Sequence, residues 1–452
     1  MPGLNFKFIH MPFYQKSLLV LTFFIPFSFA LSPTESIDLN ILKIIIPLLF
    51  LLWLAHSLTT KKLFLDNRPR FWLFITFFFL TFLSFFWTIA PANALRKILF
   101  FATTIPLYFI FYQAQRSPNF IKKFFSILSF SVFLLSLFSL ILFVFQFIIK
   151  LNTILNFLRQ FLAPFFLGHS LSSLVNQYSS WLVNISGQTI FRTLGTFPDP
   201  HLFSLYLSLS LPFVLYIYIT TKQKKYLLYS ATILTAILLS FSRAAYFSLI
   251  IGGIFLFFTS QPSQIIKKRI FFFYLLFNLI LFLLIIPNPL FSRFISSFDL
   301  QEGSNNGRIE MWLTALQIIK QHPLQGLGLG GLAEQINSSF GIRNPIYAHN
   351  LFLDFGAETG VFNMFILFLL ILSPLVLFLN NFIFNKHSNL TGQGDSSKNL
   401  FLQKLLATTF LIFFIHSLFE TPFFSIRVFP LFLMLLSLNT ENNSLSNRSL
   451  SK

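Results

Sequence analysis

Long apolar runs dominate the chain, and short polar segments separate each run from the next. A helix needs about 20 mostly apolar residues to cross the hydrocarbon core of a bilayer. Runs of this kind predict about twelve transmembrane helices, near residues 17–31, 40–58, 71–89, 98–113, 124–149, 201–220, 226–241, 244–260, 270–286, 350–379, 400–419 and 423–438. The first run lacks a small-x-small cleavage site at its end, so we interpret it as a helix rather than a signal peptide. We therefore expect an all-α, polytopic membrane protein.

Composition supports a chain surrounded by lipid. Of 452 residues, 55% are hydrophobic, only 10% are charged and 69 are Phe, whereas ordinary globular domains carry about 25% charged residues. A soluble protein could not bury that much apolar surface. The chain has no cysteine, which excludes disulfides, thiolate metal ligands and a catalytic thiolate.

The charge distribution predicts the orientation. A net charge of +19 would suit a nucleic-acid-binding protein, but in a membrane protein Lys and Arg collect in the cytoplasmic loops. Most of the 32 Lys and Arg fall into alternate segments when the N-terminus is placed inside the cell. We expect a multi-pass membrane protein with both termini cytoplasmic, and no nucleic-acid partner.

The same pattern divides the chain into parts. We expect transmembrane helices in 1–150, an extracytoplasmic amphipathic segment in 151–200, helices again in 201–286, a large extracytoplasmic loop in 287–349, the last helices in 350–438 and a cytoplasmic tail in 439–452. Helical spacing in the second part places five apolar side chains on one face, which predicts a helix lying in the membrane interface: Leu151, Ile154, Leu155, Leu158 and Leu162. The chain shows no internal repeat.

Familiar catalytic motifs are absent. The sequence has no His-Glu-x-x-His, no phosphate-binding P-loop and no Gly-x-Ser-x-Gly. The run Gly326–Gly331 resembles a dinucleotide fingerprint, but it follows a predicted helix instead of a strand. We interpret it as a flexible turn.

Four segments on the predicted outer face each combine turn-forming residues with a basic side chain. They cover residues 191–201, 239–245, 304–312 and 347–358, and their basic residues are Arg192, Arg243, Arg308 and His349. The third segment begins a predicted amphipathic helix whose apolar face contains Ile309, Trp312, Leu313, Leu316 and Ile319. Taken singly, each arginine equally fits a solvated or lipid-bound cation, and His349 equally fits a residue at a helix start beside an Asn350 cap.

Taken together, three arginines and one histidine predict a site for anionic substrates. Arginine offers a planar fork of donors that suits phosphate oxygens. A histidine at a helix N-terminus feels the positive end of the dipole, which favours the neutral imidazole that can accept a proton. A neutral base beside cationic groups suits attack by a hydroxyl on a diphosphate-linked carbon, because the arginines stabilise the departing diphosphate. No metal and no cofactor are needed for this chemistry.

These segments carry a family resemblance. The order Arg-x-x-Gly-Thr-Phe, Ser-Arg-Ala-Ala, Arg-x-x-x-Trp-x-x-Ala with Pro-Leu-x-Gly-x-Gly, and His-Asn-x-x-Leu-x-x-x-x-Glu-x-Gly resembles the O-antigen ligase and O-antigen polymerase superfamily over about residues 190–380. The resemblance implies a glycosyltransferase of the class C type that uses a polyprenyl-diphosphate-linked glycan as donor, without a metal. It also implies diphosphate-binding roles for Arg192, Arg243 and Arg308, and the role of base for His349.

Supporting roles and alternatives complete the interpretation. Asn350 and Glu358 share a helix face, and we expect Glu358 to pair with one of the arginines or with His349. His201 stands where the family commonly has Asn, so it is either a polar contact or a structural cap. Ligase and polymerase differ in their acceptor, a glycolipid or a second lipid-linked glycan, and the sequence fits both. A transporter of anions or lipid-linked sugars is the alternative from another class, although such proteins usually contain repeats.

Overall fold

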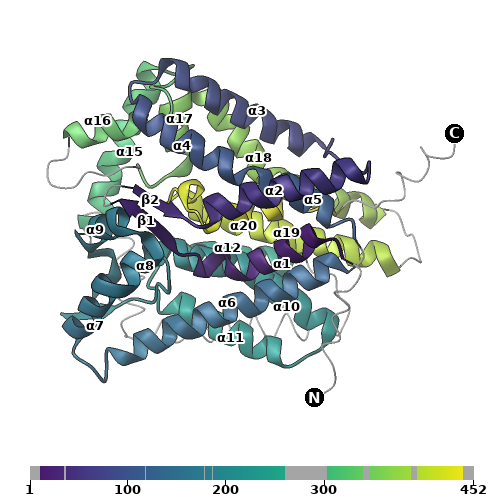
Figure 1. The fold of residues 1–452 in the computed structure, drawn as a ribbon, viewed down its shortest axis with the longest axis horizontal. Coiled ribbons are helices and arrows are strands. Elements are labelled where there is room, and N and C mark those ends of the chain that lie inside the picture. The colour runs from purple at the N-terminus through teal and green to yellow at the C-terminus, as the bar shows by residue number, and fades with distance from the viewer. Residues whose placement is uncertain are drawn as a thin grey trace.

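The computed structural model describes residues 11–34, 37–117, 119–177, 179–185, 187–259, 303–339, 347–387 and 394–440. Helices account for nearly all regular structure in these ranges (Figure 1). The first nine helices are α1 (Phe13–Phe24), α2 (Leu42–Thr59), α3 (Pro69–Leu83), α4 (Pro91–Thr104), α5 (Pro106–Ala114), α6 (Phe120–Phe145), α7 (Leu151–Phe157), α8 (Ala163–Leu167) and α9 (His169–Gln177).

The later described helices are α10 (Pro200–Thr221), α11 (Lys225–Leu238), α12 (Arg243–Phe258), α15 (Gly303–Gln321), α16 (Gly331–Ser339), α17 (Leu351–Thr359), α18 (Val361–His387), α19 (Gly394–Ser417) and α20 (Val428–Ser437). Two antiparallel hairpins join them, β1 (Ala30–Thr34) with β2 (Ile37–Asn40), and β3 (Leu182–Ile185) with β4 (Gln188–Phe191). Short 3₁₀ turns cover Ile25–Phe27, Ser84–Trp87, Ser179–Trp181 and Pro422–Phe424, and a π-turn covers Leu158–Leu162.

Apolar helices occur where the hydropathy pattern predicts them. Seven described helices are long and apolar enough to cross a membrane, and four shorter apolar helices accompany them. Eleven of the twelve predicted spans coincide with one of these helices, and the remaining one, 270–286, lies outside the described residues. The prediction of an all-α polytopic membrane protein is therefore confirmed.

Two predicted spans have different ends in the structure. The first was expected to reach residue 31, but α1 ends at Phe24 and the chain then enters the β1–β2 hairpin. The tenth was expected to run from 350 to 379 without a break, but Gly360 separates α17 from α18 with a φ of +86°. A Cβ atom at Gly360 would overlap the carbonyl oxygen of Leu324, so this position requires glycine.

The predicted apolar faces are only partly buried. In α15, Leu313 and Leu316 of the predicted apolar face are exposed, and the helix packs through Met311, Ala315 and Ile318 against α16 and α17. After α6, the predicted amphipathic helix is divided into α7, the π-turn and α8. The buried part of its apolar face packs against protein around Trp181 and Phe191. Its position in the membrane interface stays a prediction.

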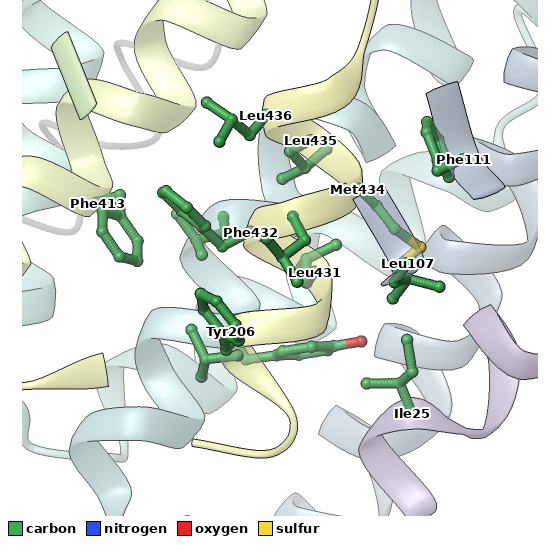
Figure 2. Packing of buried hydrophobic residues seen from close by; sticks show 14 of the residues in the cluster. Ile25, Leu107, Phe111, Tyr206, Phe413, Leu431, Phe432, Met434, Leu435 and Leu436 are labelled. Atoms are coloured by element: carbon green, nitrogen blue, oxygen red, sulfur yellow. The ribbon is translucent and has the colours of Figure 1, made fainter. Parts of the chain in front are cut away.

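The hydrophobic core surrounds α20, which lies in the middle of the bundle (Figure 1). Every residue from Val428 to Ser437 is buried. Figure 2 shows Leu431, Phe432 and Met434 of this helix among side chains from α5, α10 and α19. A ten-residue helix is too short to span a bilayer alone, so α20 depends on the protein around it.

The two ends of the bundle are formed by different elements. At one end Arg68, which precedes α3, donates to the carbonyls of Ser437 and Leu438 at 2.9 Å each, and Gln15 donates to Ser117. The hairpin β1–β2 and helices α7–α9 and α15–α17 gather at the opposite end, on the left of Figure 1. Arg308 lies in α15 and Glu358 lies in α17, so these two predicted site residues belong to elements at that end.

Candidate active site

His349 stands immediately before α17, in an unusual backbone conformation. Its φ is +52°, in the left-handed region that few residues other than glycine adopt. Asn350 follows as the N-cap of α17, and its side-chain oxygen accepts the N–H groups of Phe352 and Leu353 at 3.1 Å. The predicted cap is thus present. The His349 side chain is 40% accessible.

Glu420 joins His349 to Arg308. One carboxylate oxygen, Oε2, lies 3.1 Å from Nδ1 of His349, and the other, Oε1, accepts from Nη2 of Arg308 at 3.1 Å. The carboxylate is only 9% exposed, and the Arg308 side chain is 16% exposed. We call Arg308, His349 and Glu420 the ionic triplet. Its members come from α15, from the residue before the N-cap of α17 and from the segment after α19, which are distant in sequence.

The electrostatics of the triplet determine where the imidazole proton sits. Burial favours the neutral acid of Glu420, but His349, His201 and Arg308 outweigh this effect and hold the pKa of Glu420 far below its usual range. Burial also opposes charge on His349, yet the Glu420 carboxylate raises the pKa of His349 above its ordinary value. This direction is opposite to the predicted effect of the helix start, which favours the neutral imidazole. An ionised Glu420 can only accept a hydrogen bond, so in the neutral form of His349 the hydrogen is on Nδ1 and Nε2 is the proton acceptor.

His201 lies in the same electrostatic neighbourhood, at the start of α10. Its Nδ1 lies 3.0 Å from the hydroxyl of Ser242, which precedes α12. Asp199 caps α10 by accepting the N–H groups of His201 and Leu202 at 2.8 Å. Desolvation by the surrounding protein, reinforced by the charge of Glu420, raises the pKa of Asp199 to about 6. The side chain that caps α10 is therefore that of Asp199, and His201 contacts Ser242.

Arg192 contacts the backbone of the turn before Arg243. Its guanidinium donates to the carbonyls of Ser240 at 2.7 Å, Ser180 at 3.0 Å and Phe241 at 3.2 Å. The residue is only 3% exposed, so these contacts favour a structural role in holding the turn, and donor binding by Arg192 stays a prediction. Arg243 begins α12 and is 8% exposed.

Glu358 has a partner that the sequence did not reveal. Its two carboxylate oxygens accept from Nζ of Lys97 in α4, at 2.6 and 2.8 Å. This partner is neither an arginine nor His349, contrary to prediction. Lys97 also lies over the rings of Tyr347 and Phe424, 5.3 and 4.5 Å from their centroids. Glu358 is therefore bound within a buried ion pair next to the segments that carry His349 and Glu420.

The glycine run before α16 is a tightly packed turn instead of a flexible one. Gly326, Gly328 and Gly330 all have positive φ angles. A Cβ atom at Gly328 would overlap the backbone of Thr88, whose hydroxyl donates to the carbonyl of Leu329 at 2.8 Å. The turn fixes the end of α15 against the segment between α3 and α4, and these contacts leave no sign of a nucleotide site.

The structure brings Arg308, His349 and His201 together around Glu420, and it places Arg192 with the turn before Arg243. Sequence reasoning assigned no role in the site to Glu420 or Asp199. One feature of the sequence could have indicated a role for Glu420. A carboxylate beside an apolar span is costly unless it is paired, so a cationic partner is expected. Nothing in the sequence indicates that its partners are 71 and 112 residues away.

The apolar bundle and the ionic triplet at one of its ends define a polytopic, all-α membrane protein with a polar site at the end of its helices. The family model of O-antigen ligase matches residues 228–368. This match confirms the resemblance to the O-antigen ligase and polymerase superfamily. The matched stretch includes Arg243, Arg308 and His349, whereas Glu420 lies beyond it. A search of curated proteins finds no matching relative.

Proposed function

We propose that the protein is an O-antigen ligase-like glycosyltransferase, which moves a glycan from a polyprenyl-diphosphate donor to an acceptor hydroxyl on the extracytoplasmic face. The family match supports transfer from a lipid-linked glycan. The observation that carries the proposed mechanism is the contact between Nδ1 of His349 and Glu420, because it leaves Nε2 as a proton acceptor in an accessible side chain.

The reaction needs one proton transfer and one displacement. The acceptor oxygen forms a bond to the anomeric carbon, while the bond from that carbon to the diphosphate oxygen breaks. Nε2 of His349 takes the proton of the acceptor hydroxyl, and the diphosphate leaves with the electron pair. Negative charge grows on the diphosphate as it departs, and cationic side chains stabilise it there. Arg308 and Arg243 are the proposed donors of that charge, and the N-terminus of α12 adds the positive end of its dipole.

Purified protein should therefore be incubated with a polyprenyl-diphosphate oligosaccharide and candidate acceptors. We expect release of the diphosphate lipid together with a glycosylated acceptor. A glycolipid product identifies a ligase, and a lengthened lipid-linked glycan identifies a polymerase. Movement of intact donor across a vesicle membrane, without release of diphosphate lipid, would instead indicate a transporter.

His349→Ala tests the base within the same assay. Loss of a general base lowers the rate by about 10²–10⁴-fold, while binding of the donor should stay largely intact. His322→Ala is the matched control, because His322 is an exposed histidine at the end of α15. Turnover near that of the wild type in His349→Ala would assign the base to another residue, and His201 is the next candidate.

A further inference from the structure

A second polar network lies directly behind the ionic triplet, and it centres on Asp354. This residue is in the first turn of α17 and is 2% exposed. Its Oδ1 accepts the backbone N–H of Ala348 at 2.7 Å, and its Oδ2 accepts the hydroxyl of Thr421. Ala348 directly precedes His349, and Thr421 directly follows Glu420. One carboxylate thus joins the two segments that carry the histidine and its partner.

The third member of the triplet is linked to the same network. Trp312 lies one helical turn after Arg308 on α15, and its indole Nε1 donates to the carbonyl of Ala348 at 2.9 Å. Both backbone polar groups of the fully buried Ala348 are therefore occupied, the N–H by Asp354 and the carbonyl by Trp312. Each residue of the triplet has a neighbour in this network.

We propose that Asp354 is a positioning residue, which fixes the imidazole of His349 against the carboxylate of Glu420 by holding both adjoining segments. Two features make such a restraint necessary. His349 has the strained φ of +52°, which persists only where surrounding contacts hold it. Glu420 lies between two helices, where the ladder of a regular helix does not fix it. The bond to Ala348 is local to the helix start, whereas the bond to Thr421 spans 67 residues and is the one that aligns the pair.

Thr421 allows a test that changes no charge. The charged groups that act on His349 are Glu420, Arg308, Asp354 and Asp199. Removing Asp354 itself would alter the protonation of His349 directly, through the lost charge. Thr421→Val replaces the hydroxyl with a methyl group and introduces no charged residue. Because the hydroxyl also stabilises the ionised Asp354 carboxylate, the change in His349 is judged together with the separate effects on kcat and KM. Thr409→Val is the matched control, because Thr409 is also buried and its hydroxyl donates within α19, to the carbonyl of Leu405 at 2.9 Å.

The measurement is the pH dependence of His349 modification by diethyl pyrocarbonate, read by peptide mass spectrometry on the full-length protein in detergent. Glu420 raises the pKa of His349, so a looser pair should lower the midpoint, by about half to one pH unit. We expect this shift in Thr421→Val, recovery in Thr421→Ser and no shift in Thr409→Val. In the transfer assay, Thr421→Val should lower kcat and leave the KM for the donor unchanged.

The midpoint of His349 modification tests this inference without reference to glycan transfer. Only the expected fall in kcat rests on the proposed function. An unchanged midpoint in folded Thr421→Val would overturn the inference, whatever happens to transfer. A shifted midpoint in a protein that transfers no glycan would support the inference and contradict the proposed function. Should Thr421→Val fail to fold, Thr421→Ala makes the same deletion without a branched side chain and is judged by the same midpoint.

Discussion

The left-handed backbone of His349 makes its side chain hard to replace. Residues other than glycine, asparagine, aspartate and histidine rarely adopt this region, and β-branched residues do so least of all. The position therefore combines a conformational demand with a chemical one. Histidine meets the conformational demand at modest cost, and the contact with Glu420 at 3.1 Å then selects which ring nitrogen accepts the proton.

Glu420→Gln should change both the rate and its pH dependence. Activity requires neutral His349, so it rises as pH increases through the pKa of that residue. Because Glu420 raises this pKa, its removal moves the acid limb of the kcat profile to lower pH. We expect kcat to fall by about 10²-fold as the imidazole loses its fixed orientation. A profile measured from pH 5 to 9 checks the direction, and a limb that stays in place or moves upward contradicts it.

A contact can be predicted from the sequence when it involves one residue and its near neighbours in the chain. The Asn350 cap follows from its side chain and the apolar run behind it. The partners of Glu358 and Glu420 could not be predicted, because Lys97 and His349 meet them only after separate helices have packed. The contacts of Arg192 were equally out of reach of sequence analysis, because its guanidinium donates to backbone carbonyls of segments 12 to 49 residues away.

At the scale of elements, hydropathy predicts the presence of a helix better than its ends. Hydropathy does not separate a helix end from the strand residues beside it, so the outer residues of the β1–β2 hairpin, Ala30, Leu31 and Asn40, were included in two predicted spans. The break at Gly360 is equally invisible to hydropathy, because it depends on the carbonyl of Leu324 from another segment. The apolar stripe of α15 includes leucines that are exposed. In a membrane protein, such a stripe therefore does not identify the helix face that packs against protein.

Gly328→Ala tests how far the packed turn supports the site. A left-handed conformation costs an alanine about 1–2 kcal/mol, and the new Cβ would also overlap Thr88. Gly187→Ala is the control, since Gly187 has a similar φ of +84° and no atom within 4 Å of the added carbon. We expect a clearly lower thermal midpoint for Gly328→Ala than for Gly187→Ala in detergent. Equal thermal midpoints would mean that the backbone around Thr88 can shift to accommodate the added carbon with little loss of stability.

At the scale of the whole molecule, the two polar ends should lie on opposite sides of the membrane. Thr60 and Ser173 are exposed and belong to opposite ends in the predicted topology. The chain has no cysteine, so Thr60→Cys and Ser173→Cys each provide a single thiol. A membrane-impermeant maleimide should label Ser173→Cys in intact cells and label Thr60→Cys only after permeabilisation. The reverse pattern would invert the topology and move the ionic triplet to the cytoplasmic side.

The buried pair of Lys97 and Glu358 also constrains how such a chain can change over generations. Loss of one partner leaves a buried charge alone, at a cost of about 3–5 kcal/mol, whereas exchange of both for apolar residues of similar volume is often neutral. We expect Lys97→Met and Glu358→Leu each to reduce the yield of folded protein, and the double variant to recover it. In descendants of this chain, an apolar pair would therefore replace the ion pair only when both residues are substituted. Positions 97 and 358 would change together.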